Sequence, residues 1–208
     1  APLGEPVVLK DTATEYLHGA QVQVLEDVGG SLTLAQAQAA TAWQALKGGQ
    51  PSFGYTGSAF WLRVVLRNAH PTQEAWQFGV RYPLLDEVDL HVLDAAGQVR
   101  QHHATGDRRA FGQRPVAHPD FYVNVPLREG ETNTVYVRMR SQGSVQASLV
   151  VTTPMVRLEA ARAEFGWIGL YGGALLAMLL YNLMLFLSLR DRSYLYYVGY
   201  LTAFGMAQ

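Results

Sequence analysis

FGWIGLYGGALLAMLLYNLMLFLSL, residues 165–189, is a run of 25 residues without a charged side chain. As an α-helix rising about 1.5 Å per residue, this run would exceed the ~30 Å hydrocarbon core of a bilayer. A buried helix of a soluble domain is the alternative, but such helices seldom stay uncharged for more than ~14 residues. The segment therefore predicts a transmembrane helix, with Trp167 and Tyr171 near its first membrane interface.

The residues after this helix predict its orientation. The loop 190–193 contains Arg190 and Arg192, and a second apolar run, 194–208, follows it. That run has 15 residues, fewer than the ~20 that a crossing helix needs, so we expect the truncated start of a second membrane helix. Because cytoplasmic loops are rich in Lys and Arg, we expect the loop in the cytoplasm and residues 1–164 outside. The chain opens at Ala1 without an initiator Met, as a mature exported protein does.

The residues before the membrane helix predict a rigid connection. After Pro154, residues 155–164 (MVRLEAARAE) are mostly good helix formers and contain neither Gly nor Ser. A flexible linker would be expected to contain those residues. We therefore expect a juxtamembrane helix that continues directly into the membrane.

The outer region is typical of β-strands. Residues 60–67 (FWLRVVLR) alternate an apolar set, at the even positions, with a set that contains Trp61 and the arginines. Similar alternation recurs in residues 76–82, 88–92, 121–127 and 135–139, and Pro, Gly, Asn and Asp clusters separate the runs. This pattern predicts an all-β sandwich. The exception is residues 31–46, where a helical stripe followed by Gly48 and Gly49 predicts one short helix.

The opposite faces of these strands carry the candidate binding residues. Aromatic rings, planar donors and carboxylates are what a surface needs to stack on a sugar ring and bind its hydroxyl groups. The alternative is an ordinary solvated sheet face, since alternation alone produces polar outer faces. The residues in this phase are Trp61, Arg63, Arg81, Asp89, His91, Tyr122, Asn124, Tyr136 and Arg138.

Composition and missing motifs exclude several classes of function. With 16 Lys and Arg against 17 Asp and Glu, the chain lacks the basic excess of a nucleic-acid binder. Without cysteine it has no disulfide, thiol catalysis or Cys-containing zinc site. No G-x-S-x-G, Walker A or H-E-x-x-H motif occurs. The histidines 102–103 are more typical of a solvated loop than of a metal site, and the acidic residues 86–89 of a strand entry than of a calcium site. We therefore expect no catalysis, metal or cofactor.

Several motifs resemble a known receptor family. Residues 59–63 (AFWLR), 82–90 (YPLLDEVDL), 105–107 (TGD), 114–118 (RPVAH) and 141–144 (SQGS) are similar to the second type of extracellular domain in bacterial seven-transmembrane receptors with diverse intracellular signalling modules. Residues 171–182 and 189–197 resemble the opening of the membrane domain of these receptors. The resemblance extends from about Val22 to the end of the chain.

The resemblance implies a periplasmic, jelly-roll-like β-sandwich similar to carbohydrate-binding modules. It further implies a bacterial inner-membrane domain of seven helices and a cytoplasmic output domain such as a histidine kinase, diguanylate cyclase or phosphatase. The expected divisions are an unassigned segment 1–21, the sandwich 22–154, the juxtamembrane helix 155–164, the first membrane helix 165–189 and the start of the second, 194–208.

Together, these patterns predict a sensor whose outer domain binds a carbohydrate or another small polar ligand and relays the signal through the membrane. The alternatives are a membrane-tethered module that binds a protein partner or a second copy of itself and, third, a surface glycosidase-like enzyme. The expected ligand-binding residues are Trp61, Arg63, Tyr82, Asp86, Asp89, His91, Asp107, Arg114, His118, Tyr122 and Arg138.

Overall fold

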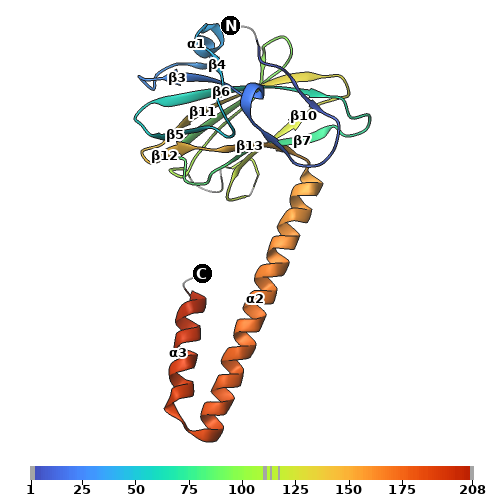
Figure 1. Ribbon diagram of the computed structural model, residues 1–208. Coiled ribbons are helices and arrows are strands. Elements are labelled where there is room, and N and C mark those ends of the chain that lie inside the picture. Colours follow the sequence, from blue (N-terminus) through green and yellow to red (C-terminus); the bar gives the residue numbers. More distant parts are fainter. Residues whose placement is uncertain (1–2, 110–111, 113, 117, 207–208) are drawn as a thin grey trace. The chain divides into compact units, whose positions relative to one another are not determined.

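The computed structural model describes residues 3–109, 112, 114–116 and 118–206. The chain divides into two compact units, which we call the outer unit (residues 1–157) and the helical unit (residues 158–208). Most of the outer unit is β-sheet, and the helical unit is made of long helices (Figure 1). The prediction of a mostly β outer region followed by helices is confirmed.

Two large sheets and one small sheet form the outer unit. Among the strands that the structure describes, all pair antiparallel except β1, which lies parallel to β6. The seven-stranded sheet has the order β4 (Gln44–Ala45), β3 (Gln23–Asp27), β6 (Ala59–Asn68), β11 (Thr132–Arg140), β8 (Glu87–Leu93) and β9 (Val99–Thr105), with β1 (Val7–Leu9) also on β6. The four-stranded sheet has the order β10 (Phe121–Pro126), β7 (Ala75–Arg81), β13 (Ser148–Thr152) and β2 (Glu15–Leu17). The small sheet pairs β12 (Ser144–Gln146) with β5 (Ser52–Tyr55).

The main core lies where the inner faces of the two large sheets meet. Phe60, Leu62, Val64 and Leu66 on β6 are buried together with alternate residues of β7, as period-two alternation requires. Burying each such side chain contributes about 1.5–3 kcal/mol to folding. All members of this core come from residues 7–151, so the outer unit has a hydrophobic core of its own.

The helix expected over residues 31–46 is much shorter than predicted, and that prediction is wrong in length. The helix α1 spans only Leu34–Ala39. Its start is fixed by Thr33, whose hydroxyl accepts a hydrogen bond from the Gln36 backbone N–H. After α1 the chain turns back, because the indole N–H of Trp43 donates to Ala37 O at 2.9 Å and β4 then pairs with β3. We call residues 31–46 the cover segment.

A short 3-10 turn and two long helices are also present. A 3-10 turn, η1, spans Gly19–Gln21. The helix α2 spans Pro154–Leu189, so the residues expected to form a juxtamembrane and a membrane helix form one continuous helix. By length and composition α2 can cross a membrane. It ends at Arg190, whose φ of 56° is a left-handed conformation, and α3 follows over Arg192–Met206.

Candidate ligand-binding site

The outer face of the seven-stranded sheet carries Trp61, but the structure does not expose it. Trp61 is only 2% exposed and packs in a second hydrophobic cluster with Ala37, Trp43 and Tyr136. The cover segment lies over this part of the sheet. The prediction that Trp61 stands on an open, ligand-accessible surface is therefore wrong, because residues of the cover segment pack over it and shield it from solvent.

Two arginines of this face contact the cover segment or the residue just before it. Arg63 is 3% exposed; its Nε donates to Gln23 Oε1 at 2.8 Å, and its guanidinium lies 4.5 Å from the centre of a Trp43 ring. Arg138 donates to Gly30 O at 2.8 Å and pairs with Asp89 at 3.3 Å. The planar guanidinium group suits both tasks, because it offers donors in a fixed fork and stacks on aromatic rings.

His91 lies at the rim of the same face. Its ring stacks on His102 of the neighbouring strand, with centroids 4.2 Å apart and planes 4° apart, and it lies 5.9 Å from Trp61. Burial, and then the charge that His102 can carry, lower the pKa of His91 to about 4. His91 is therefore neutral at pH 7. Among the residues that the structure describes, no group of three or more His, Asp or Glu side chains could hold a metal ion.

A second set of predicted residues ties loops together at one end of the sheet. Asp86 accepts a hydrogen bond from the Gln142 N–H at 2.6 Å and forms an ion pair with Arg108 at 3.3 Å. The backbone N–H of the exposed Asp107 donates to Leu85 O at 2.8 Å. Asp86 thus faces a loop, whereas Glu87 and Asp89 both pair with Arg138, at 3.5 and 3.3 Å, so the three acidic residues of 86–89 do not form one cluster.

Gly106, inside the motif 105–107, explains why that motif has its sequence. It has a φ of +142°, and a Cβ built there would lie 2.1 Å from Asp86 O. Only glycine fits this position without moving the backbone. The motif therefore has a structural role in this chain.

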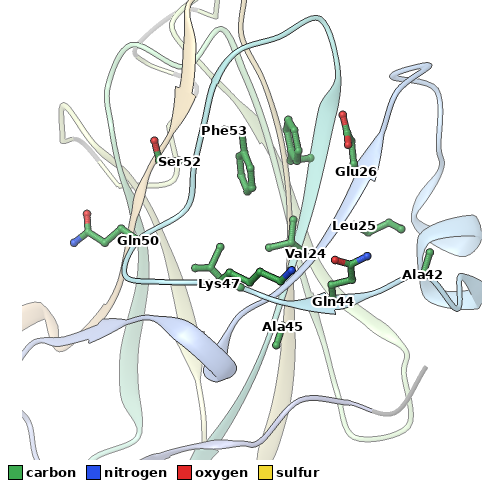
Figure 2. Close-up of a pocket in the computed structure, with 12 residues that line it drawn as sticks. Val24, Leu25, Glu26, Ala42, Gln44, Ala45, Lys47, Gln50, Ser52 and Phe53 are labelled. Atoms are coloured by element: carbon green, nitrogen blue, oxygen red, sulfur yellow. The ribbon is translucent and has the colours of Figure 1, made fainter.

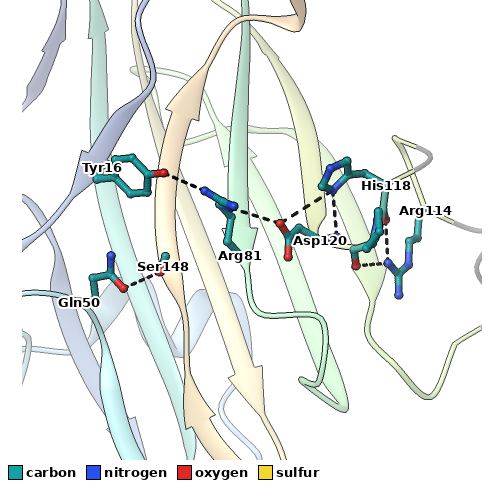
Figure 3. A network of polar contacts seen from close by, with 8 residues as sticks. Tyr16, Gln50, Arg81, Arg114, His118, Asp120 and Ser148 are labelled. Carbon is teal, nitrogen blue, oxygen red and sulfur yellow. Dashed lines mark hydrogen bonds and ion pairs between the residues drawn. The ribbon is translucent and has the colours of Figure 1, made fainter. Parts of the chain in front are cut away.

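The third set lies at the start of β10 and in the chain before it; Figure 3 shows Arg114 and His118 of this set. Arg114 donates to His118 O at 2.8 Å and also to Pro119 O, and its guanidinium lies 4.7 Å from the centre of the Phe121 ring. Tyr122 is 6% exposed, and burial raises the pKa of its phenol. The structure thus distributes the predicted residues over three places; the half-buried Tyr82 packs against the main core. Their role in ligand binding stays a prediction.

The structure shows a groove elsewhere, at one end of the inner face of the seven-stranded sheet. Its volume is about 430 Å³, within the 300–1,000 Å³ range typical of small-molecule sites. Figure 2 shows the side chains of β3, β5 and the intervening chain that surround it. The lining residues are Val24, Leu25, Glu26, Ala42, Gln44, Ala45, Leu46, Lys47, Gln50, Ser52, Phe53 and Phe60.

The groove combines a flat aromatic surface with polar groups. Phe53 is half-buried and stacks on Phe60, with ring centroids 3.9 Å apart and planes 3° apart. The carboxylate of Glu26 accepts a hydrogen bond from Ser58 Oγ at 2.8 Å. Lys47 adds an amine, and the remaining polar lining is amides and a hydroxyl, from Gln44, Gln50 and Ser52. Such a set can stack on an apolar sugar face and bind hydroxyl groups.

The sequence contained a signal for this groove that strand alternation alone did not reveal. Val22, just before β3, and Val24 and Glu26 on β3 share the inner phase, so a carboxylate occupies a phase that is otherwise apolar. A charged residue in the inner phase at a strand end indicates that the opposing sheet does not cover it there. Phe53 has no comparable signal in the sequence, because β5, the strand that carries it, has only four residues and shows no clear alternation.

The family comparisons agree with the sequence motifs. Residues 19–153 match the family model described as 7TMR-DISM extracellular 2, and residues 164–208 match the model described as 7TM diverse intracellular signalling. The resemblance predicted from the sequence is confirmed by these two matches. The comparison with curated proteins found no match.

Some solved structures show a distant likeness. An insecticidal delta-endotoxin from Bacillus thuringiensis is 14% identical over 50% of this chain and 19% of its own, with a TM-score of 0.29. A GH31 alpha-xylosidase from Xanthomonas citri is 11% identical over 70% of this chain and 16% of its own, with a TM-score of 0.35. A GH115 4-O-methyl-alpha-glucuronidase is 10% identical over 70% and 18%, with a TM-score of 0.31. This chain thus spans less than a fifth of the length of each of these proteins.

Proposed function

The chain belongs to the family of 7TMR-DISM type 2 extracellular domains, and from that premise we propose that its outer unit senses a carbohydrate bound in the groove of Figure 2. The family makes the chain the extracellular sensory part of a membrane receptor, joined to the start of its membrane domain. The ligand class is the step that we add. One observation supports it above the others: the Phe53 ring, stacked on Phe60, lies beside hydrogen-bonding side chains.

The chemistry of sugars matches this lining. A pyranose ring has an apolar face that packs on an aromatic plane, and its hydroxyl groups both donate and accept hydrogen bonds. The Glu26 carboxylate accepts, the Lys47 ammonium donates, and the amides of Gln44 and Gln50 do both. A purely apolar ligand would leave these polar groups without partners when it displaced water.

The same proposal includes the cellular setting. It places residues 1–164 in the periplasm of a bacterium, residues 22–154 in a jelly-roll-like sandwich, and the loop 190–193 in the cytoplasm, with an output domain beyond the membrane helices. Arg190 and Arg192 support this orientation through the positive-inside rule. An alkaline phosphatase fusion after Ser193 is expected to be inactive, and an active fusion would contradict the orientation.

Binding experiments on the outer unit test the ligand class. Residues 1–157 can be used alone because they contain their own core. We expect a glycan array to identify a ligand, and titration calorimetry to show that Phe53→Ala weakens its binding about tenfold or more through loss of stacking. Glu26→Gln should weaken binding less, because the amide keeps the size and one acceptor.

Tyr55→Ala is the matched control, since Tyr55 lies on the same strand but is 85% exposed and outside the groove lining. If the Phe53→Ala variant and the wild type bind the glycan with equal affinity, the glycan does not bind in this groove. Self-association of the outer unit without any glycan binding would instead support the alternative of an assembly module.

A further inference from the structure

A second, smaller hollow adjoins the groove. Its volume is about 220 Å³, below the range of a complete small-molecule site. Gln50 and Ser52 line both the groove and this hollow, so the two share a wall. The full lining of the hollow is Gln50, Pro51, Ser52, Arg81, Tyr82, Gln146, Ala147 and Ser148. A ligand longer than one sugar ring can therefore reach from the groove across Gln50 and Ser52 into the hollow.

Arg81 is the cation of this hollow, and it is held in a fixed position. Its Nη1 donates to Tyr16 Oη at 2.8 Å, and its Nε donates to Asp120 Oδ2 at 3.3 Å. Figure 3 shows the guanidinium between these two partners, with Gln50 and Ser148 to one side. The side chain is still 45% exposed. A long side chain that is already ordered loses little conformational entropy when it binds a ligand.

The guanidinium has donors left for a ligand. It carries five N–H groups, and its hydrogen bonds to the part of the chain that the structure describes use two of them. The planar fork of remaining donors matches a carboxylate better than it matches a neutral hydroxyl, because both partners are charged and two parallel bonds can form. Asp120 binds at the Nε side, and apart from the Nη1 bond to Tyr16 the Nη donors make no hydrogen bond to the described part of the chain.

We propose that the ligand is an acidic oligosaccharide whose carboxylate binds Arg81 while a neighbouring sugar ring stacks on Phe53. This inference rests on the proposed function, because it assumes that the groove binds saccharides. It adds the charge and the minimum length of the ligand. The hollow takes the acidic unit, and the larger groove takes the next unit of the chain.

The test compares each acidic saccharide with its own neutral form. The probes are uronic-acid oligosaccharides of several linkages and the same oligosaccharides after reduction of the carboxyl groups, titrated into residues 1–157. We expect the acidic form of the bound saccharide to bind about tenfold or more tightly than the reduced form. Raising the salt concentration should narrow this difference, because Arg81 is partly exposed to solvent.

Variants of Arg81 test whether this residue causes the preference for the acidic form over the reduced form. Arg81→Gln should give the acidic and reduced forms equal affinity, and Arg81→Lys should keep part of the preference through its charge without the fork. Arg100→Gln is the matched control: Arg100 is also exposed and paired with an aspartate, Asp94, but lies on β9. If Arg81→Gln changes the melting temperature, the preference is measured again in Tyr16→Phe, which removes only the hydroxyl that orients Arg81. This variant should have a smaller preference for the acidic form than the wild type.

Each outcome decides between the two proposals. Equal binding of acidic and reduced forms by the wild type would overturn this inference and leave the proposed function standing. A preference that persists in Arg81→Gln with normal folding would also overturn it. Binding of no saccharide at all would overturn the proposed function, and this inference with it.

Discussion

The two large sheets carry similar residues on their outer faces and shield them in different ways. On the seven-stranded sheet a separate stretch of chain, the cover segment, seals Trp61 and Tyr136 from solvent. On the outer face of the four-stranded sheet, Tyr16 and Arg81 remain about half exposed. The difference shows that strand alternation tells which side of a sheet a residue faces. Whether that side meets water depends on chain outside the strand.

Removing the sealed aromatic ring should have the largest effect. Trp61→Ala leaves a large cavity beneath the cover segment, and we expect it to lower the free energy of unfolding of residues 1–157 by about 3–5 kcal/mol. Urea denaturation followed by circular dichroism measures this loss. Tyr55→Ala, at an 85% exposed aromatic residue, should stay within about 0.5 kcal/mol. Similar losses in the two variants would mean that Trp61 is not sealed in solution.

Crowding the side-chain layer of the four-stranded sheet should have a smaller effect. A Cβ at Gly79 would lie 2.4 Å from Tyr122 Cε1 and 2.8 Å from Val150 Cγ2, so Gly79→Ala must displace the Tyr122 ring. We expect a loss of about 1–3 kcal/mol in the same denaturation experiment. Combining it with Tyr122→Ala should cost less than the sum of the two single changes. Strict additivity would show that the two residues do not touch.

The outer face of the four-stranded sheet also contacts the start of α2. This contact should contribute about 1 kcal/mol to the free energy of unfolding. Arg157 Nε donates to Gln77 Oε1 at 2.8 Å, and its guanidinium lies 5.5 Å from the centre of the Tyr122 ring. A double-mutant cycle with Arg157→Met and Gln77→Leu, on the full chain in detergent micelles, measures the coupling. Arg162→Met on the same helix is the control and should show no coupling to Gln77→Leu. Zero coupling at Arg157 would mean that the first turn of α2 is not fixed to the sheet.

The smallest effect concerns pH at the rim of the sealed face. Because the pKa of His91 is about 4 in the folded state and about 6.5 when unfolded, the unfolded chain binds more protons between these values. His91 therefore lowers stability as pH falls from 6.5 to 4. After discounting for its partial exposure, we expect this contribution to be on the order of 1 kcal/mol or less.

Melting temperatures between pH 7 and 4 measure the contribution of His91. His91→Phe keeps an aromatic ring against His102 and should have a flatter pH dependence than the wild type. His18→Asn, at an exposed histidine on another part of the chain, is the control and should follow the wild type. A steeper pH dependence in His91→Phe than in the wild type would contradict a lowered pKa of His91 in the folded state.

The periodic parts of the fold were predictable from sequence. The inner phase of β6, from Phe60 to Leu66, is buried as alternation predicts, and the uncharged residues 165–189 lie within α2. These elements follow from local rules, since alternate side chains of a strand point to opposite faces and a spanning helix excludes charge. The length of the helix in the cover segment was not predictable in this way. The helix ends after Ala39 because the chain turns back and Trp43 donates to Ala37 O, which no local pattern specifies.

The candidate site was predictable only in part. Predicting it required knowing where one sheet extends beyond the other, which depends on strand lengths and on the pairing of β5 with β12. Strand alternation predicted that Arg81 lies on an outer sheet face. Its partners Tyr16 and Asp120, however, lie 65 and 39 residues away in sequence. No spacing rule connects residues that far apart, because loops of different length can bring the same strands together.

The position of β13 determines when the outer unit can finish folding. In the four-stranded sheet β13 lies between β2 and β7, so Leu17 near the start of the chain pairs with Leu149 near the end of the unit. At 5–20 residues per second, ribosomes take on the order of ten seconds to synthesise the chain between them. During that time β2 and one edge of β7 have no strand to pair with, and unpaired edges favour aggregation. The four-stranded sheet can thus be completed only after β13 has been made, shortly before α2.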